Sequence, residues 1–467
     1  MTDTLPTTTS PTQSTGKLLT ALIVGGITAI FDTTIVAIGL HTLTERLDAP
    51  ISTIQWVSTG YLLALAVAIP FVSWAQEKFG GKRLWLFALG LFVLGSILCA
   101  CAWNAESLIA FRVVQGLGGG IMFPLMQTLA MQNVAPTAMA RTMAVVGLPI
   151  ALGPILGPVL GGIVLHWLDW QWLFLINVPL GVAGLVLAAI VINADHPHRG
   201  TTSQRLDFAG AALLVPALAG LLYGLSNVHA EGGFSRIDVF LPCVAGVVLL
   251  VAFVGWAIRR AGTALIDVRL LAQRSVRASS ITLSFLGATL FASTFLLPLY
   301  FQSLRGADVL TAAVLLIPQG VGTFLARLIA GKLVDALGAR LVAVVGFLII
   351  AAATIPFALA DANASVWLLG ITLFIRGFGL GVVLIPVMTV AYIDIRKDQM
   401  PHASAITRIV QQLGGAFGTA LVAVVLSAVT AQADAQSGFQ TTFWWTIAIT
   451  IAAAIASLLL PSREKNQ

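Results

Sequence analysis

Two ionisable residues stand where the surrounding sequence is otherwise apolar. Asp32 lies in the run FDTTIVAIGL, and Arg112 lies in the run RVVQGLGGG. A charged side chain at the middle of a bilayer costs about 2.5–3.5 kcal/mol on insertion scales, so such a residue faces a wet cavity or an oppositely charged partner. A carboxylate held between burial and a nearby cation can load and release protons. We therefore expect Asp32 and Arg112 to form a proton-coupling pair; a structural ion pair that never titrates is the alternative.

Arg112 has a polar neighbour on its own segment. Gln115 follows three residues later, on the same face of a helix. Three more arginines fall inside apolar stretches, namely Arg327, Arg376 and Arg408. These three lie nearer the predicted cytoplasmic side, and we expect their side chains to extend to that surface.

The rest of the sequence has the composition of an integral membrane protein. Hydrophobic residues make up 58% of the 467 positions and charged residues 9%, whereas soluble proteins carry roughly 25% charged residues. A membrane-spanning helix needs about 20 predominantly apolar residues. The sequence contains fourteen such stretches, which are 18–40, 53–74, 84–103, 108–132, 140–165, 173–192, 208–228, 239–258, 276–301, 310–331, 341–359, 366–392, 405–429 and 442–460. The predicted fold is an all-α polytopic membrane protein.

Loop charges predict how these helices are oriented. If both termini lie in the cytoplasm and the loops alternate, most basic residues outside the stretches fall on the cytoplasmic side. Only Arg46, Arg236 and Arg305 fall on the outer side. Cytoplasmic loops carry an excess of Lys and Arg in membrane proteins. The asymmetry therefore supports the helix count, and it explains the net charge of +6 without nucleic acid as a partner.

The chain repeats itself at an offset of about 260 residues. SWAQEKFGGKR follows the second stretch and GKLVDALGAR follows the tenth, while RVVQGLGGG in the fourth has a looser counterpart, RGFGLG, in the twelfth. Duplicated bundles with a binding site between them are a transporter architecture. The expected units are a disordered tail at 1–17, a six-helix bundle at 18–194, a linker with two additional helices at 195–262, a second six-helix bundle at 263–460 and a cytoplasmic tail at 461–467.

A glycine pattern in the fifth stretch predicts close helix packing. Gly153, Gly157 and Gly161 recur every four residues, and Pro154 and Pro158 lie between them. Glycines at this spacing form a groove in which another backbone approaches closely, and prolines bend a helix locally. We expect a sliding interface between helices here.

The two repeated loops carry charges that favour a gate. The first copy contains Glu77 and Gly80. Lys78, Lys82 and Arg83 lie beside them, and the second copy contains Gly331, Lys332, Asp335, Gly338 and Arg340. Ordinary anchoring of positive loops is the alternative. The repetition favours a charge latch that holds the bundles closed on one face.

Several polar or soft residues within or at the ends of the stretches are candidates for lining a substrate path. They are Tyr61, Gln115, Met126, Gln127, Tyr300, Gln302, Gln319 and Gln412. No GxxxxGK[ST] loop and no GxSxG motif occurs, the histidines show no metal pattern, and the three cysteines read as small hydrophobic residues. We therefore expect a protein that is no enzyme, holds no metal or cofactor and uses a proton gradient as its energy source.

In combination these motifs resemble the major facilitator superfamily, in its fourteen-helix drug:proton antiporter branch. The resemblance covers nearly the whole chain and rests on SWAQEKFGGKR, RVVQGLGGG, GLPIALGPILGPVLGG and FDTTIVAIGL, with WLFLINVPLG, LDFAGAALL and ALIDVRLL in support. It implies proton-driven export of drugs or similar lipophiles by rocking of two bundles. It carries proton coupling onto Asp32 and Arg112, and gating onto Glu77 and Gly80.

The expected function is proton-coupled efflux of small lipophilic, often cationic compounds across the inner membrane of a bacterium. The expected partners are that substrate, protons and the lipid bilayer. The protein is expected to be a monomer, and an outer-membrane partner is possible but not indicated. Two alternatives stay open: a dedicated exporter of one endogenous metabolite, lipid or siderophore, and a non-transporting membrane sensor or assembly partner.

Overall fold

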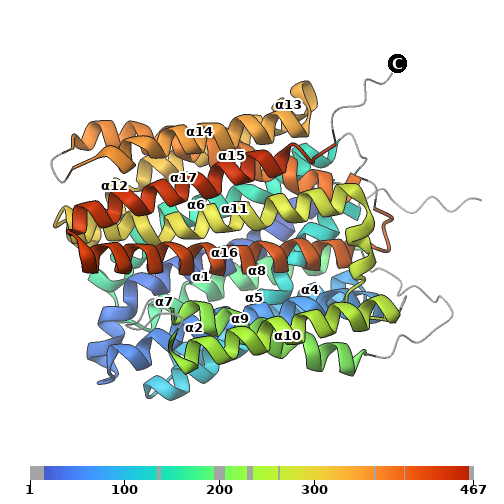
Figure 1. The fold of residues 1–467 in the computed structure, drawn as a ribbon. Coiled ribbons are helices and arrows are strands. Elements are labelled where there is room, and N and C mark those ends of the chain that lie inside the picture. The colour runs from blue at the N-terminus through green and yellow to red at the C-terminus, as the bar shows by residue number, and fades with distance from the viewer. Residues whose placement is uncertain are drawn as a thin grey trace, which may run out of the picture.

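The described part of the chain is built from helices that run side by side (Figure 1). The computed structural model describes residues 15–132, 134, 138–193, 206–228, 235–260, 263–361, 364–393 and 395–461. The helices are α1 (Thr15–Arg46), α2 (Ile51–Ala68), α3 (Val72–Phe79), α4 (Gly81–Ala100), α5 (Ala105–Gln132), α6 (Met139–Trp167), α7 (Trp172–Leu175), α8 (Asn177–Val191), α9 (Phe208–Ser226), α10 (Ile237–Arg259), α11 (Arg274–Leu299), α12 (Val309–Leu315), α13 (Ile317–Leu337), α14 (Ala339–Leu359), α15 (Val366–Ile393), α16 (Met400–Gln432) and α17 (Ala435–Ser457).

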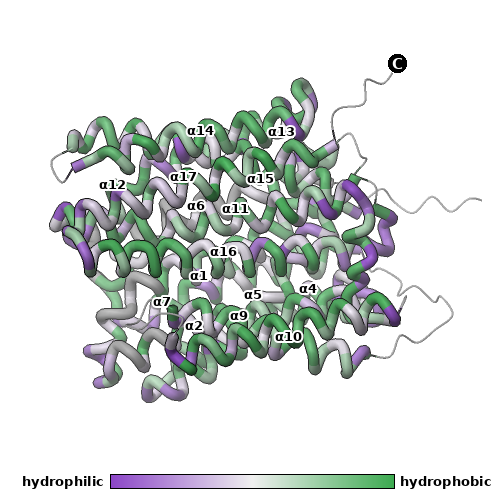
Figure 2. The backbone as a smooth tube through the Cα atoms, viewed as in Figure 1, coloured by the Kyte–Doolittle hydropathy of each residue, from purple (hydrophilic) through white to green (hydrophobic). Residues whose placement is uncertain are grey.

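Membrane-spanning length is common to nearly all of these elements. Within the described ranges, thirteen helical stretches are long and apolar enough to cross a membrane. The remaining expected stretch, 140–165, corresponds to α6, which is 29 residues long. Hydrophobic residues follow the helices along their length and polar residues gather at their ends (Figure 2). The predicted all-α polytopic fold is confirmed, although α1 begins at Thr15, inside the tail expected at 1–17.

The helices alternate in direction, so their termini gather at two ends of the bundle. These two ends differ in charge. We call the end where α3, the start of α6 and the start of α16 lie the α3 end, and the opposite one the far end. By the helix bounds, Lys82 and Arg141 lie at the α3 end, whereas Arg46, Arg236 and Arg305 lie at the far end. The basic side expected from the loops is therefore the α3 end.

Two groups of helices repeat one packing pattern. In the N-terminal half (α1–α8), α5 packs against α2 and α4, and α1 packs against α6 and α8. In the C-terminal half (α11–α17), α15 packs against α13 and α14, and α11 packs against α16 and α17. The intervening helices α9 and α10 pack on each other, and α9 also contacts α2 and α16. One helix of the additional pair thus touches both halves.

Among the residues whose side chains the structure describes, the two halves share an apolar core toward the α3 end. One cluster of buried side chains contains Met126 of α5 together with Met388 of α15 and Ile406 of α16. Toward the far end the cores are separate: one cluster, with Leu108, belongs to the N-terminal half, and another, with Phe357, belongs to the C-terminal half. Because apolar burial holds packed elements together, the halves are joined at the α3 end.

The repeated loops fold into the same glycine junction. Gly80 joins α3 to α4 with φ 82°, and Gly338 joins α13 to α14 with φ 83°. Left-handed backbone of this kind suits glycine because glycine lacks a Cβ atom. The internal repeat found in the sequence therefore has a matching backbone conformation in both halves.

The glycine stripe of α6 packs against α1. A Cβ atom on Gly153 would lie 2.7 Å from the Ile30 side chain, and one on Gly161 would lie 3.3 Å from the Ile35 carbonyl oxygen. Gly157 faces Thr34. The stripe thus serves close packing inside the N-terminal half in this structure. Pro154 and Pro158 belong to α6, and their side chains lie outside the described residues.

Substituting a packed glycine tests these contacts. A Cβ atom on Gly118 of α5 would lie 2.7 Å from both Ala88 O and Phe92 N of α4. Gly118→Ala should lower the unfolding temperature in detergent, because overpacking of this kind costs about 1–3 kcal/mol. Gly90→Ala on α4 is the control, since a Cβ atom there meets nothing within 4 Å, and it should be neutral or stabilising. Equal unfolding temperatures for the two variants would contradict the packing described.

Candidate functional site

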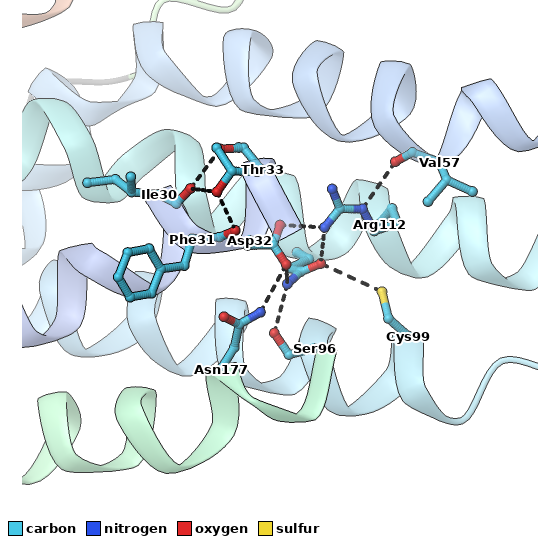
Figure 3. A network of polar contacts seen from close by, with 11 residues as sticks. Ile30, Phe31, Asp32, Thr33, Val57, Ser96, Cys99, Arg112 and Asn177 are labelled. Atoms are coloured by element: carbon cyan, nitrogen blue, oxygen red, sulfur yellow. Dashed lines mark hydrogen bonds and ion pairs between the residues drawn. The ribbon is translucent and has the colours of Figure 1, made fainter. Parts of the chain in front are cut away.

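A polar network lies inside the N-terminal half, with Asp32 at its centre (Figure 3). Asp32 sits in the middle of α1, and its side chain points toward α4, α5 and the start of α8. α1 contacts α2, α5, α6 and α8, so the aspartate is enclosed by protein rather than lipid. Its exposed fraction is 0%.

The Asp32 carboxylate accepts three side-chain hydrogen bonds. Oδ2 accepts one from Arg112 Nη1 at 2.5 Å, and Oδ1 accepts one from Gln115 Nε2 and one from Asn177 Nδ2, each at 2.9 Å. A buried charge is tolerated only when it is paired and hydrogen-bonded. Two helices, α5 and α8, supply the donors to this carboxylate, and the predicted pairing of Asp32 with Arg112 is present.

Arg112 is held on several sides. Nη1 also donates to Gln115 Oε1 at 2.7 Å, and Nε donates to the carbonyl oxygen of Val57 in α2 at 3.1 Å. The guanidinium carbon lies 4.1 Å from the ring centroid of Tyr61 and 5.7 Å from that of Phe174. A cation over an aromatic face gains about 2 kcal/mol or more when it is desolvated. Tyr61 therefore belongs to this network and stabilises the arginine.

Gln115 connects the ion pair to α4. Its Nε2 also donates to Ser96 Oγ at 2.7 Å. Its Oε1 accepts a hydrogen bond from the Cys99 thiol at 3.7 Å. Cys99 was expected to be a small hydrophobic residue, but its thiol takes part in the network. Protonation of Asp32 would alter hydrogen bonds to α5 and α8, and through Gln115 the change would extend to α4. The network thus links Asp32 on α1 to α4, α5 and α8 through side-chain hydrogen bonds.

Other residues predicted to line a substrate path lie between the halves or near Arg376. Gln127 Oε1 accepts a hydrogen bond from Tyr392 Oη of α15 at 3.5 Å. Met126 faces α1, with Sδ 2.8 Å from where a Cβ atom of Gly26 would lie. Gln319 Oε1 accepts from Arg376 Nη1 at 2.8 Å.

Tyr300 lies in an aromatic cluster of the C-terminal half. Its ring makes edge contacts with Phe301, Phe357, Phe439 and Phe443 at centroid distances of 5.3–5.7 Å. This environment is that of a packed core residue. Gln302 follows in the π-helical turn Tyr300–Leu304. Gln412 is 9% exposed, and its Oε1 has no partner among the described residues.

The first repeated loop reaches across to the other half. Glu77 Oε1 lies 3.2 Å from His402 Nε2 at the start of α16, and the Asp267 N–H donates to His402 Nδ1 at 3.4 Å. The second loop differs: Asp335 is exposed, and Arg340 Nε donates to the Leu460 carbonyl oxygen at 2.6 Å within its own half. Gly331 lies against α6, where its Cβ would be 3.1 Å from Arg141 Cα. Of the two carboxylates, only Glu77 has an ion-pair geometry between the halves.

The expected surface position of three arginines is wrong. Arg327 is 2% exposed and its Nη1 donates to the Gly147 carbonyl oxygen of α6. Arg376 is 1% exposed. Arg408 is half-buried, 4.7 Å over the Phe123 ring. These side chains point into the protein because neighbouring helices offer carbonyl, hydroxyl and aromatic partners at their depth.

Sequence reasoning missed three contributors to these contacts, which are Ser96, Asn177 and His402. Asn177 lies inside the apolar motif WLFLINVPLG. An unpaired amide in such a run is costly, so its position could have indicated a buried hydrogen-bond partner. Ser96 and His402 carry no comparable signal. Among the described residues, no group of three or more His, Cys, Asp or Glu side chains could hold a metal ion.

Comparison with known proteins agrees with this architecture. The family model described as Major Facilitator Superfamily matches residues 22–419. The chain is 38% identical, over 88% of its length and 76% of the relative's, to a protein named multidrug resistance protein B homolog in Mycobacterium tuberculosis. It is 30% identical, over 85% and 82%, to a protein named putative multidrug resistance protein MdtD in Serratia proteamaculans.

A solved structure shares the fold. The proton:xylose symporter XylE superposes with a TM-score of 0.68 at 14% identity and 94% coverage of both chains. The family match covers most of the chain, and the helix packing repeats between the halves as it does in duplicated transporters. The chain belongs to the major facilitator superfamily of membrane transporters, in the branch whose members bear multidrug-resistance names.

Proposed function

We propose that the protein is a proton-coupled antiporter that exports small lipophilic compounds through a bacterial cytoplasmic membrane. Relatives over most of the chain carry multidrug-resistance names, which supports a broad substrate range. A dedicated exporter of one endogenous compound is the alternative, and a panel of unrelated drugs separates the two. We place the α3 end in the cytoplasm because Lys and Arg gather there.

The observation that carries the proposal is the environment of Asp32. Among the described residues it is the only carboxylate that is fully buried. It is bound to one cation and two amides, so its charge state is coupled to the positions of α1, α5 and α8. A proton carrier needs a group that is stable in both states and that reorganises its surroundings between them.

The cycle follows from where the halves touch. We assign the α3 end, where the halves share a core, to the cytoplasmic side, and we interpret an arrangement closed at that end as the outward-facing state. In that state Asp32 takes a proton, its attraction to Arg112 falls and substrate leaves. After the halves rock and the α3 end opens, substrate from the cytoplasm displaces the proton, and Asp32 ionises beside Arg112 again. Glu77 and His402 hold the outward-facing state closed on the cytoplasmic side.

The available energy is sufficient for efflux. A membrane potential of about 100 mV supplies roughly 2.3 kcal/mol per charge, and one pH unit adds about 1.4 kcal/mol. Together about 3.7 kcal/mol sustains an approximately 500-fold gradient of a neutral substrate at one proton per molecule. A single carboxylate is therefore enough to drive resistance.

Asp32→Asn is expected to uncouple transport. In proteoliposomes with the voltage clamped at zero, one pH unit should let the wild type build an about tenfold gradient of a neutral dye. The variant keeps an amide oxygen for Arg112 but binds no proton, so its dye should only equilibrate. Asp32→Glu should retain partial coupling. The unfolding temperatures of Asp32→Glu and Asp32→Asn show whether both variants fold.

The control for this experiment is Asp398→Asn. Asp398 forms an exposed ion pair with Arg396 at 3.0 Å and should behave as the wild type. A wild-type dye gradient in Asp32→Asn would place the coupling group elsewhere.

Joining the halves at the α3 end should stop turnover. Gly331 and Arg141 are close enough for Gly331→Cys and Arg141→Cys to form a disulfide, which needs Cβ atoms roughly 3.5–4.5 Å apart. Oxidation of the double variant should abolish dye efflux, and reduction should restore it. Each single variant under oxidation is the control. If the cross-linked protein exported dye at the rate of the reduced protein, opening at this end would not be part of the cycle.

A further inference from the structure

A second buried polar cluster lies in the C-terminal half, around Arg376 of α15. Arg376 is 1% exposed. Its Nε donates to Thr354 Oγ1 of α14 at 3.2 Å, its Nη1 donates to Gln319 Oε1 of α13 at 2.8 Å, and its Nη2 donates to Ser293 Oγ of α11. The function proposed above does not use this cluster.

The cluster is the repeat counterpart of the Asp32 network. Arg376 begins RGFGLG as Arg112 begins RVVQGLGGG. Its partners come from α11, α13 and α14, the first three spans of their half, as those of the first network come largely from α1, α2 and α4. Ser293 on α11 occupies the place that Asp32 has on α1. The duplicated site thus keeps its arginine and replaces the carboxylate with a hydroxyl group.

This replacement leaves a buried cation without a counter-charge. All three acceptors of Arg376 are neutral side chains. The other arginines of the C-terminal spans also have neutral acceptors and so add no negative charge. Arg327 donates to a carbonyl oxygen, and Arg408 donates to Gln411 Oε1 at 3.0 Å. No carboxylate of this half is among the fully buried residues of the described chain. An uncompensated charge in the interior is costly, so an anion that reached Arg376 would be stabilised there.

The position of Arg376 suits a ligand that enters between the halves. The residue lies in the part of α15 nearer the far end, where the described side chains of the two halves form separate core clusters. Gln319, which binds its guanidinium, is only half-buried. Movement of this one amide would give an incoming group access to Nη1.

We propose that Arg376 binds the anionic oxygens of an exported lipophilic acid, such as a carboxylate or sulfonate. The proposal rests on the export function above and names its substrate class. The charged group of the acid would pair with the guanidinium, and its aromatic or aliphatic body would lie on the side of α15 that faces the N-terminal half once the halves separate. Arginine suits this role because its planar fork pairs with a carboxylate through two parallel hydrogen bonds.

One consequence separates acids from cations. Export of a monovalent anion against import of one proton moves two positive charges inward per cycle, so an inside-negative potential should accelerate efflux of an acid steeply. Exchange of one monovalent cation for one proton is electroneutral and should respond to the pH difference alone. The charge distribution in the C-terminal half therefore favours acids over the cations that the sequence suggests.

The test compares an aromatic carboxylate with its methyl ester in proteoliposomes. Ser293→Asp supplies an internal counter-charge to Arg376, and Ser293→Ala removes the hydroxyl group without adding charge. Ser293→Asp should lower efflux of the acid by about tenfold or more, as expected for a lost charge pair in a desolvated site, and should leave efflux of the ester and its dependence on Asp32 unchanged. Ser293→Ala should lower efflux of the acid less than Ser293→Asp does, because it removes one acceptor of Arg376 without adding a counter-charge, and Asp398→Asn, at an exposed ion pair outside the cluster, should export both compounds as the wild type does.

Each other outcome overturns the assignment. If Ser293→Asp folds, with a wild-type unfolding temperature, and still exports the acid normally, Arg376 does not bind it. If the acid and the ester decline together, the cluster is structural. If wild-type efflux of the ester requires chloride, and replacing chloride with gluconate abolishes it, the anion at Arg376 comes from solution rather than from substrate. In the first and third cases the ester is measured again with Asp32→Asn. If ester efflux still depends on Asp32, only the assignment of Arg376 fails and the proposed proton-coupled export stands.

Discussion

The desolvated ion pair between Asp32 and Arg112 constrains how the helices of the N-terminal half pack. Neither charge can face lipid, and neither can be left alone in the interior. The chain meets this requirement by bringing α1, α4, α5 and α8 into contact at one depth, with Gln115 donating to two of the acceptors. Close helix packing is the means: Gly116 and Gly118 let α5 approach α2 and α4 directly. The ion pair and the glycine contacts of α5 therefore depend on each other.

The same constraint gives the two halves different properties. Both halves keep an arginine in the equivalent span, but only the first half keeps the acid. A proton bound at Asp32 changes charge inside the N-terminal half, whereas Arg376 keeps a constant charge in the C-terminal half. The contact of Glu77 with His402 across the halves adds to this asymmetry, because Asp335, the counterpart of Glu77 in the second repeated loop, is exposed. The repeat supplies two similar frames, and side-chain substitutions give them separate tasks.

Much of this could be predicted from particular residues. Asp32 is the only acidic residue inside the apolar stretches and needs a cationic partner. Arg112 was the predictable partner because the other three arginines lie nearer the predicted cytoplasmic side. The glycine junctions were predictable from the repeat. The direction of Arg327 and Arg376 was not, because hydropathy gives the depth of a residue and not the face of the helix that carries it. Ser96 is a partner that only three-dimensional packing selects. Tyr300 proved to be a core residue because Phe301 and three phenylalanines distant in sequence converge on it.

The helix pair α9–α10 has a mechanical consequence for the membrane around the protein. α9 contacts α2 of one half and α16 of the other, while the apolar window of α10 is only 17% buried and presents its side chains outward. Any rotation of one half against the other must shear α9 along at least one neighbour, and α10 must displace the molecules beside it. Acyl-chain order and lateral pressure thus oppose the movement of α10 and lower the transport rate. The same transporter should run more slowly in a stiff, saturated bilayer than in a fluid one at equal driving force.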